Sequence, residues 1–365
     1  MPTDAPSLQE SSVLASRRIL RVAAGTALGM FVSQSVGWPM SFAAALLAFV
    51  FLSLPLPRPT LKMAIGFVFV LGAASFSGVV LLPFLQYARW VGIGLFVLAL
   101  FHTFYFTAKG GSAALGTFMT LGLTLVAAVG SVSSFVMVEI ATWLTVSGIW
   151  GMGFVWLAHA LIPDPPTLPG AASPKPPTPE PPDLETARLR ALRSLLIVLP
   201  IALICFFSSS STSYLIVMIK VATMGQQANV DSSRTAGRSM LQSTIIGGVG
   251  AIIAWQVLSI WPSLLIYTLV LGLFALLVGP KIFQGPGMHP TGAMWSYAYL
   301  TMIVVLAPAV TDGLGSDGAA SAFYTRLFLF LVIAVYGSTA VAVFDAFWPR
   351  VMGGRGVAQS PPAPA

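Results

Sequence analysis

The sequence predicts an all-α polytopic membrane protein with about twelve transmembrane helices in two parallel six-helix repeats. Hydrophobic residues make up 56% of the chain and charged residues only 8%, whereas soluble domains average about 25% charged residues. Apolar stretches of roughly 17 to 25 residues, each long enough to cross a bilayer, recur along the whole chain. The arginine pair that opens the first stretch, Arg18 and Arg21, recurs as Arg190 and Arg193.

An internal repeat is the second organising feature of the chain. Gly94-Leu95-Phe96 has a counterpart in Gly272-Leu273-Phe274, 178 positions later. The segment between the two halves, Pro163 to Asp183, holds ten of the 27 prolines. Such a composition favours extended polyproline II structure and builds no core, so we expect either a tether or a segment recognised by a partner domain. Duplicated sets of membrane helices are a common plan of transporters.

The predicted spans follow from the apolar stretches and their polar boundaries. In the first half they are 19–37, 39–56, 61–82, 88–108, 112–133 and 137–162, and in the second 192–209, 211–225, 239–260, 262–280, 294–310 and 322–348. The predicted divisions are an N-terminal segment (1–18), a first repeat (19–162), a linker (163–187), a second repeat (188–349) and a disordered tail (350–365). The first apolar stretch has no clear cleavage site and is expected to be a retained helix.

The distribution of positive charge orients these spans. With the N-terminus inside, fifteen of the eighteen Lys and Arg residues fall on the inner side, Arg89 and Arg326 fall outside, and Lys220 lies within a span. Positive residues concentrate on the cytoplasmic side of membrane proteins. We therefore expect both termini in the cytoplasm, and the net charge of +7 reflects topology rather than nucleic-acid binding.

Signatures of enzymes, metals and cofactors are missing from the sequence. Cys205 is the single cysteine, and the three histidines, His102, His159 and His289, are far apart. There is no P-loop, and the serine run 208–213 has no histidine near it in sequence. We expect no enzymatic activity, no metal and no cofactor.

The strongest candidate for a functional residue is Lys220, because a lysine at membrane depth costs a few kcal/mol and often marks a substrate path. Its span, 211–225, and the matching span 39–56 are short and flanked by polar or proline-rich sequence. Short segments at matching places in two repeats point to a binding site. The predicted substrate path comprises Lys220, Gln226, Gln227, Arg234 and Arg238. The alternatives are a lysine that reaches the membrane surface and arginines that follow the positive-inside rule.

Two further groups complete the prediction. His102, Asp345 and Glu139 are candidates for proton coupling, with hydrated helix ends or a hydrogen-bonded interior histidine as the alternative. Arg89 and Arg326, the exceptions to the charge rule, are candidates for an outer mouth that attracts anions, with lipid headgroup contact as the alternative.

One stretch of the second half carries a family resemblance. Ser213-Tyr-Leu-Ile-Val is followed by Gln226-Gln-Ala-Asn, Arg234-Thr-Ala-Gly-Arg238 and Ser243-Thr244-Ile-Ile-Gly247. This order resembles the fusaric acid resistance superfamily, which includes bacterial aromatic acid exporters. Ser243 stands where the family has its first Gly, the first half fits more loosely, and the large cytosolic domain of many members is replaced by the proline-rich linker.

From the lysine at membrane depth and the repeat, we expect a multi-pass protein of the bacterial inner membrane that exports small anionic aromatic or amphiphilic compounds, driven by the proton gradient. The resemblance implies efflux of aromatic carboxylates or related toxic compounds. It also implies a periplasmic membrane-fusion adaptor as a partner. Plant malate channels are similar to the same superfamily and have six-helix subunits that dimerise, so the alternatives include a homodimer and a passive organic-anion channel. A scaffold for envelope assembly and a major-facilitator protein are further alternatives. Pro57-Arg58-Pro59-Thr60 stands where the major-facilitator loop motif would lie.

Overall fold

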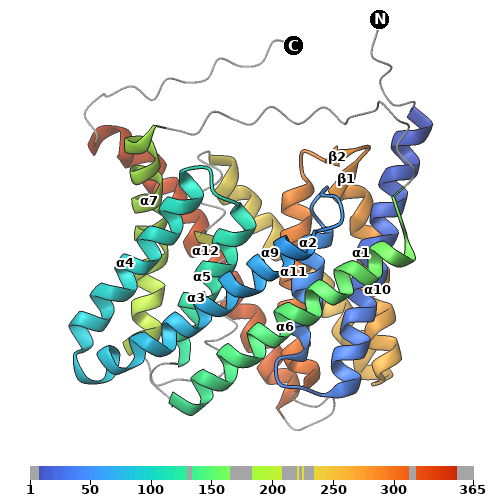
Figure 1. Cartoon of the computed structure of the whole chain (residues 1–365), viewed down its shortest axis with the longest axis horizontal. Coiled ribbons are helices and arrows are strands. Elements are labelled where there is room, and N and C mark those ends of the chain that lie inside the picture. The colour runs from blue at the N-terminus through green and yellow to red at the C-terminus, as the bar shows by residue number, and fades with distance from the viewer. Residues whose placement is uncertain are drawn as a thin grey trace, which may run out of the picture.

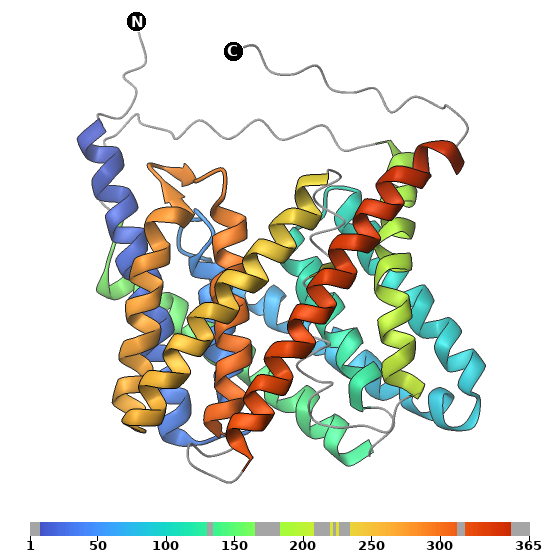
Figure 2. The same cartoon turned by 180° about the vertical axis from the view of Figure 1, so that it is seen from behind.

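The structure is a computed structural model, and it describes residues 8–129, 134–164, 183–207, 220–221, 224–225, 234–311 and 318–351. Within these ranges the chain forms eleven α-helices and one short β-hairpin (Figures 1 and 2). The first helices are α1 (Leu8–Val36), α2 (Ser41–Leu52), α3 (Leu61–Tyr87), α4 (Arg89–Ala108), α5 (Ala113–Val129) and α6 (Ser134–Leu161). The remaining helices are α7 (Leu184–Phe207), α9 (Arg234–Ile260), α10 (Leu264–Ile282), α11 (Gly292–Thr311) and α12 (Ala319–Val351).

The described part contains eight helices that are long and apolar enough to cross a membrane, so the chain is a multi-pass membrane protein. They are α1, α3, α4, α6, α9, α10, α11 and α12. This number differs from the predicted twelve. In the region of two predicted spans, α2 and the 115–124 part of α5 are shorter apolar helices, and most of span 211–225 lies outside the described residues.

Helix α2 shows why the predicted span 39–56 is wrong. Its 12 residues cover about 18 Å, against a bilayer core of about 30 Å. The helix ends at Leu52 and is followed by Pro55, Pro57 and Pro59. Because the residue before a proline avoids helical dihedrals, this alternation prevents the helix from continuing. Ten of the twelve residues are nevertheless buried, so α2 lies inside the bundle rather than on its surface.

Helix α7 also differs from the predicted spans. It carries four charged side chains in its first ten residues, Glu185, Arg188, Arg190 and Arg193. This charged beginning extends the helix towards the linker, whereas the sequence predicts a span that starts at 192. The start of α1, the start of α7 and the end of α12 lie at the same edge of the bundle (Figures 1 and 2).

The two halves of the chain are interleaved rather than separate. Helix α1 packs along α10 from the second half, and α7 packs along α4 from the first half, as both views show (Figures 1 and 2). Within each half, α3 packs on α5 and α6, while α9 packs on α11 and α12. The largest hydrophobic core accordingly combines side chains of α1, α2 and α6 with side chains of α9, α10 and α11.

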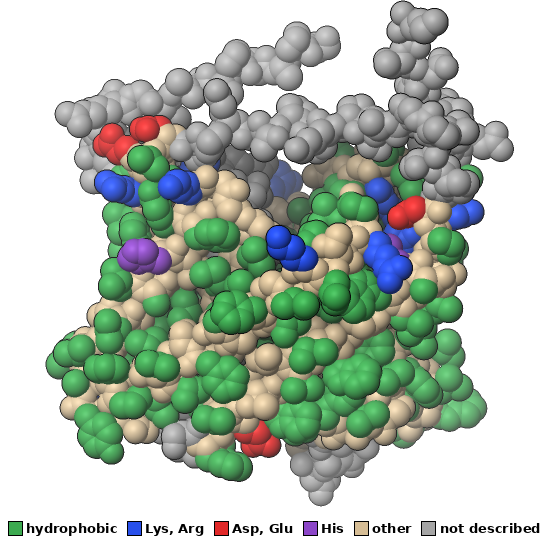
Figure 3. Space-filling view, viewed as in Figure 1, with side chains coloured by type: hydrophobic (Ala, Val, Ile, Leu, Met, Phe, Trp, Pro, Cys, Tyr) green, Lys and Arg blue, Asp and Glu red, His purple; other side chains and the backbone are tan. Residues whose placement is uncertain are grey.

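The short hairpin joins α10 to α11 at the edge where α1 begins (Figure 1). Strand β1 (Phe283–Gln284) pairs antiparallel with β2 (Gly287–Met288), and Gly285 in the turn has a φ of 56° that favours glycine. The face in Figure 3 shows the Lys and Arg side chains along the upper part of the molecule, above a broad surface of hydrophobic side chains. This separation is typical of a bilayer-facing belt below a charged interface.

Candidate functional site

Lys220 is a buried lysine in the interior of the helix bundle. Its side chain is 4% exposed, and its Nζ donates a hydrogen bond of 3.3 Å to Oγ1 of Thr301 in α11. The same Nζ lies 5.9 Å from the ring centroid of Phe330 in α12, within the range of a cation–π contact. Thr301 is the tenth of the 20 residues of α11, so the lysine contacts this helix midway along its length.

Helix α11 is the central wall of this site, and 13 of its 20 residues are buried. Thr301 contacts Lys220, while Tyr299, two residues earlier, contacts α2: its ring centroid lies 4.6 Å from that of Phe49. Residues two apart in a helix point in nearly opposite directions. Helix α11 therefore lies between α2 and Lys220. These belong to the two predicted short spans, 39–56 and 211–225.

Glycines of α9 allow the close packing behind Thr301. A Cβ atom at Gly247 would collide with the carbonyl oxygen of Ala298 and lie 2.8 Å from the Cβ of Thr301. A Cβ at the neighbouring Gly248 would lie 2.9 Å from Leu327 in α12. Small residues at such positions let membrane helices approach closely. The glycine pair thus lets α9 pack closely against α11 and α12, the two helices that contact Lys220.

A second buried basic residue lies on the face of α12 that carries Phe330. Arg326 is 5% exposed and precedes Phe330 by four residues in α12, so both side chains lie on one face of the helix. The sequence predicts an outer-mouth position for Arg326. In the structure it lies in the second turn of α12, within the candidate membrane span Ala319–Phe344, and its side chain is buried.

The other predicted members of the substrate path are only partly described. Gln226 and Gln227 lie outside the described residues. Arg234 begins α9, but its side chain lies outside the described part of the chain, while Arg238 is exposed one turn later. The contacts that the structure gives for Lys220 are with Thr301 of α11 and Phe330 of α12.

The predicted proton-coupling residues lie on three different helices. His102 in α4 is exposed, with Nδ1 2.8 Å from the carbonyl oxygen of Leu98. Glu139 in α6 is also exposed, and Asp345 lies in α12 with its side chain outside the described part. Arg89, the other predicted mouth residue, begins α4 and is exposed. None of these side chains is among the described contacts of Lys220.

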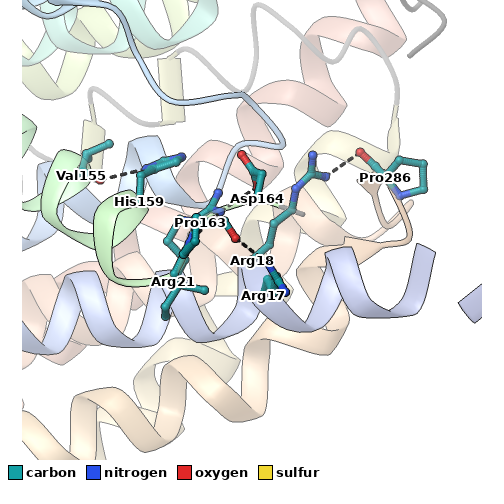
Figure 4. A network of polar contacts seen from close by, with 9 residues as sticks. Arg17, Arg18, Arg21, Val155, His159, Pro163, Asp164 and Pro286 are labelled. Carbon is teal, nitrogen blue, oxygen red and sulfur yellow. Dashed lines mark hydrogen bonds and ion pairs between the residues drawn. The ribbon is translucent and has the colours of Figure 1, made fainter. Parts of the chain in front are cut away.

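An ionic network that the sequence does not predict joins α1 to the end of α6 (Figure 4). Arg21 is 3% exposed. Its guanidinium donates to the carbonyl oxygen of Ile162 at 2.8 and 3.1 Å and forms an ion pair of 2.7 Å with Asp164. Arg17 donates to the carbonyl oxygen of Pro163 at 2.9 Å. The carbonyl groups of Ile162 and Pro163 directly follow the last residue of α6, and the two arginines supply their hydrogen-bond donors.

The same network reaches the hairpin, and a buried histidine lies beside it (Figure 4). Arg18 donates a hydrogen bond of 2.6 Å to the carbonyl oxygen of Pro286, which ties α1 to the hairpin between α10 and α11 (Figure 4). His159 is 8% exposed, and its Nδ1 lies 2.9 Å from the carbonyl oxygen of Val155. Its Nε2 has no hydrogen-bond partner among the described residues. The sequence shows both the arginine pair and the end of the first predicted repeat at residue 162. The bond from Arg21 to Ile162 spans 141 positions, so the sequence does not show that the two are in contact.

Groups of acidic, histidine and cysteine side chains suited to a metal ion are absent from the described part of the chain. The side chain of Cys205 lies outside it.

Comparison with known families gives a match to the first half of the chain. Residues 18–157 match the model of a family described as "Protein of unknown function (DUF2955)". The matched region runs from Arg18 in α1 to Leu157 in α6 and therefore covers the first group of helices. Comparisons with curated proteins and with solved structures give no match.

Proposed function

We propose that this protein is an inner-membrane transporter that exports small anionic aromatic or amphiphilic compounds, with Lys220 as the group that binds the anion. The observation that carries the proposal is the position of Lys220: buried, midway along α11, hydrogen-bonded to Thr301 and close to the ring of Phe330. A buried ammonium group favours a counter-anion. The adjacent aromatic ring offers an apolar surface on which an aromatic substrate can stack.

We infer a duplicated architecture, which would place the transport path between the two halves. Helices α3 and α9 each have 27 residues, and α4 and α10 have 20 and 19. The packing of α1 on α10 corresponds to that of α7 on α4, as an exchange of the two halves requires. We infer two parallel repeats with both termini in the cytoplasm, in which the segment containing Lys220 corresponds to α2.

In the proposed cycle, a cytoplasmic anion enters beside Arg238 and reaches Lys220. The hydroxyl of Thr301 orients the ammonium group, and the anion neutralises it inside the bilayer. Protons drive export, with His102, Glu139 and Asp345 as the proposed carriers and His159 as a further candidate because it is buried beside charged groups. A periplasmic adaptor would carry the substrate onward.

Transport in proteoliposomes tests this proposal. The substrate is a radiolabelled aromatic carboxylate such as benzoate, and uptake is measured with and without a pH gradient. Lys220→Met is expected to reduce transport at least tenfold, because an unpaired carboxylate in hydrocarbon costs several kcal/mol. Lys109→Met, which changes an exposed lysine after α4, is the matched control and should transport normally. Transport by Lys220→Met at the wild-type rate would refute the role of the lysine.

The same preparation separates an exporter from a channel. A proton-coupled exporter moves the carboxylate against its gradient when a pH gradient is present. Currents in planar bilayers that follow the anion gradient and ignore the pH gradient would instead identify a passive organic-anion channel. Wild-type protein that moves no anion in either assay would contradict both activities.

A further inference from the structure

An open pocket of about 340 Å³ lies on the side of the bundle, where the segment before α3 meets the last turns of α6. It is lined by Arg58, Pro59, Thr60, Leu61 and Trp156. Its volume is at the lower end of the range of small-ligand sites. The pocket is formed by residues 58–61 and by α6, whereas the contacts given for Lys220 are with α11 and α12. A ligand in this pocket would therefore serve a role beyond the proposed transport.

The walls of the pocket are held in place by hydrogen bonds. The indole Nε1 of Trp156 donates to the carbonyl oxygen of Pro59 at 2.9 Å, which fixes the half-buried ring against the segment before α3. Thr60 accepts a hydrogen bond of 3.3 Å from the backbone N–H of Met63. Because a hydroxyl can accept and donate at once, the hydroxyl proton of Thr60 remains available for a ligand.

Arg58 gives the pocket its charge. Its side chain is exposed, and in the described part of the chain no hydrogen bond or ion pair engages its guanidinium. A guanidinium group presents a planar set of donors that matches the oxygens of a phosphate or carboxylate. Together with the hydroxyl of Thr60, the guanidinium group of Arg58 forms a polar wall that suits an anionic group.

Apolar side chains continue from the pocket along α3. Leu61, Met63, Ile65 and Phe69 are 63%, 57%, 61% and 72% exposed, which indicates contact with lipid in a membrane-spanning helix. On the α6 side, Leu157 and Leu161 are exposed next to Trp156. The pocket therefore lies at the boundary between positive charge and apolar surface, and a ligand that fits it is charged at one end and apolar at the other.

We propose that this pocket binds the phosphate of an anionic phospholipid headgroup. Arg58 would hold the phosphate oxygens, Thr60 would donate one hydrogen bond, and the indole of Trp156 would pack beside the glycerol. The acyl chains would run along the exposed side chains of α3. A free phosphate ester offers the same anionic group, but it lacks the chains that would cover the apolar surface below.

The test compares lipid and soluble ligands on the detergent-purified, full-length protein. Thermal unfolding is followed during titration with phosphatidylglycerol, phosphatidylcholine or soluble glycerol phosphate, and native mass spectrometry counts the lipids that stay bound. Phosphatidylglycerol is expected to raise the melting temperature and to remain bound, whereas the other two ligands do neither. Arg58→Ala should weaken phosphatidylglycerol binding about tenfold, because it removes a charge-assisted pair.

Lys109→Ala is the matched control, since it removes another exposed positive charge without touching the pocket, and it should bind phosphatidylglycerol normally. Arg58→Lys should retain part of the affinity, because it keeps the charge and loses the planar geometry. An equal loss in Arg58→Ala and Lys109→Ala, or no loss in Arg58→Ala, would overturn the site. Stabilisation by glycerol phosphate that depends on Arg58 would overturn the lipid and identify a free phosphate ester as the ligand.

Discussion

Thr301 is the residue through which α11 contacts Lys220, and it links the buried charge to the framework of the bundle. Its hydroxyl accepts the hydrogen bond from Nζ at 3.3 Å. The absence of a side chain at Gly247 allows the Cβ of Thr301 to lie close to α9. Because an ammonium group can rotate and extend in many ways, one fixed acceptor restricts where its charge lies. The threonine is therefore expected to set the position of the anion.

Replacing Thr301 with valine tests this positioning role. The change keeps the shape and removes the acceptor, so anion affinity is expected to fall several-fold while the maximal rate changes less. Initial transport rates at varied substrate concentration measure both quantities. Thr268→Val is the control, since Thr268 is also buried but bonds to Leu265 of its own helix. Equal kinetics in the two variants would contradict the role of Thr301.

Arg21 illustrates a residue whose importance is structural. It joins α1 to the carbonyl of Ile162 and to Asp164. Arg21→Ala is expected to destabilise the protein by about 2 kcal/mol, because it removes hydrogen bonds from a charged donor and one partner of a partly buried ion pair. Unfolding in detergent with increasing denaturant measures the change. Arg17→Ala, which loses one exposed hydrogen bond, should have a much smaller effect, and a larger one would refute this account.

At the level of helices, the sequence predicts existence and order better than length. Apolar stretches locate α1, α3, α4, α6 and α9 to α12. A helix that crosses a bilayer satisfies its own backbone hydrogen bonds and needs about 20 predominantly apolar residues, which are easily seen in a sequence. Hydropathy does not register that the alternating prolines after Leu52 stop α2, nor that α7 begins in a charged turn. Similarly, Lys220 stands out by its charge, but its contact with Thr301 spans 81 positions and depends on tertiary packing.

Packing between α9 and α11 provides a prediction at this scale. Gly247→Ala is expected to lower stability by about 1–3 kcal/mol, because its methyl group would collide with the backbone of Ala298 and force the helices apart. Transport should fall as well, since Thr301 would move. Gly94→Ala is the control, because a Cβ at Gly94 would meet no neighbouring atom within 4 Å. Thermal unfolding measures the stability of both variants, and transport assays measure their activity. A fully stable Gly247→Ala would contradict tight packing at this point.

For the whole molecule, interleaving means that neither half contains all of its own packing partners. Helix α1 needs α10, and α4 needs α7. The recurring arginines and the recurring Gly-Leu-Phe predict a repeat from the sequence. They do not predict that helices of the two halves pack on each other, because similarity between two segments gives no contacts. A chain cut within the linker is therefore expected to assemble only from both pieces.

Coexpression of residues 1–170 and 171–365 tests this expectation. The two pieces should copurify as a stable complex, while the first piece expressed alone should unfold at lower temperature or aggregate, since the faces of α1 and α4 that contact α10 and α7 would lack partners. Copurification and thermal unfolding are the measurements. A stable monomer formed by the first piece alone would contradict the interleaved packing.

The pairing of α1 with α10 also has a consequence for biogenesis. Helix α10 begins 228 positions after α1 ends, a distance that a ribosome covers in roughly 10 to 50 s. During this interval the first helix resides in the bilayer without its main neighbour, although Arg21 can already join it to the end of α6. That early contact would keep α1 upright and in place until the matching surface is synthesised, so the arginine network would act during membrane insertion as well as in the finished protein.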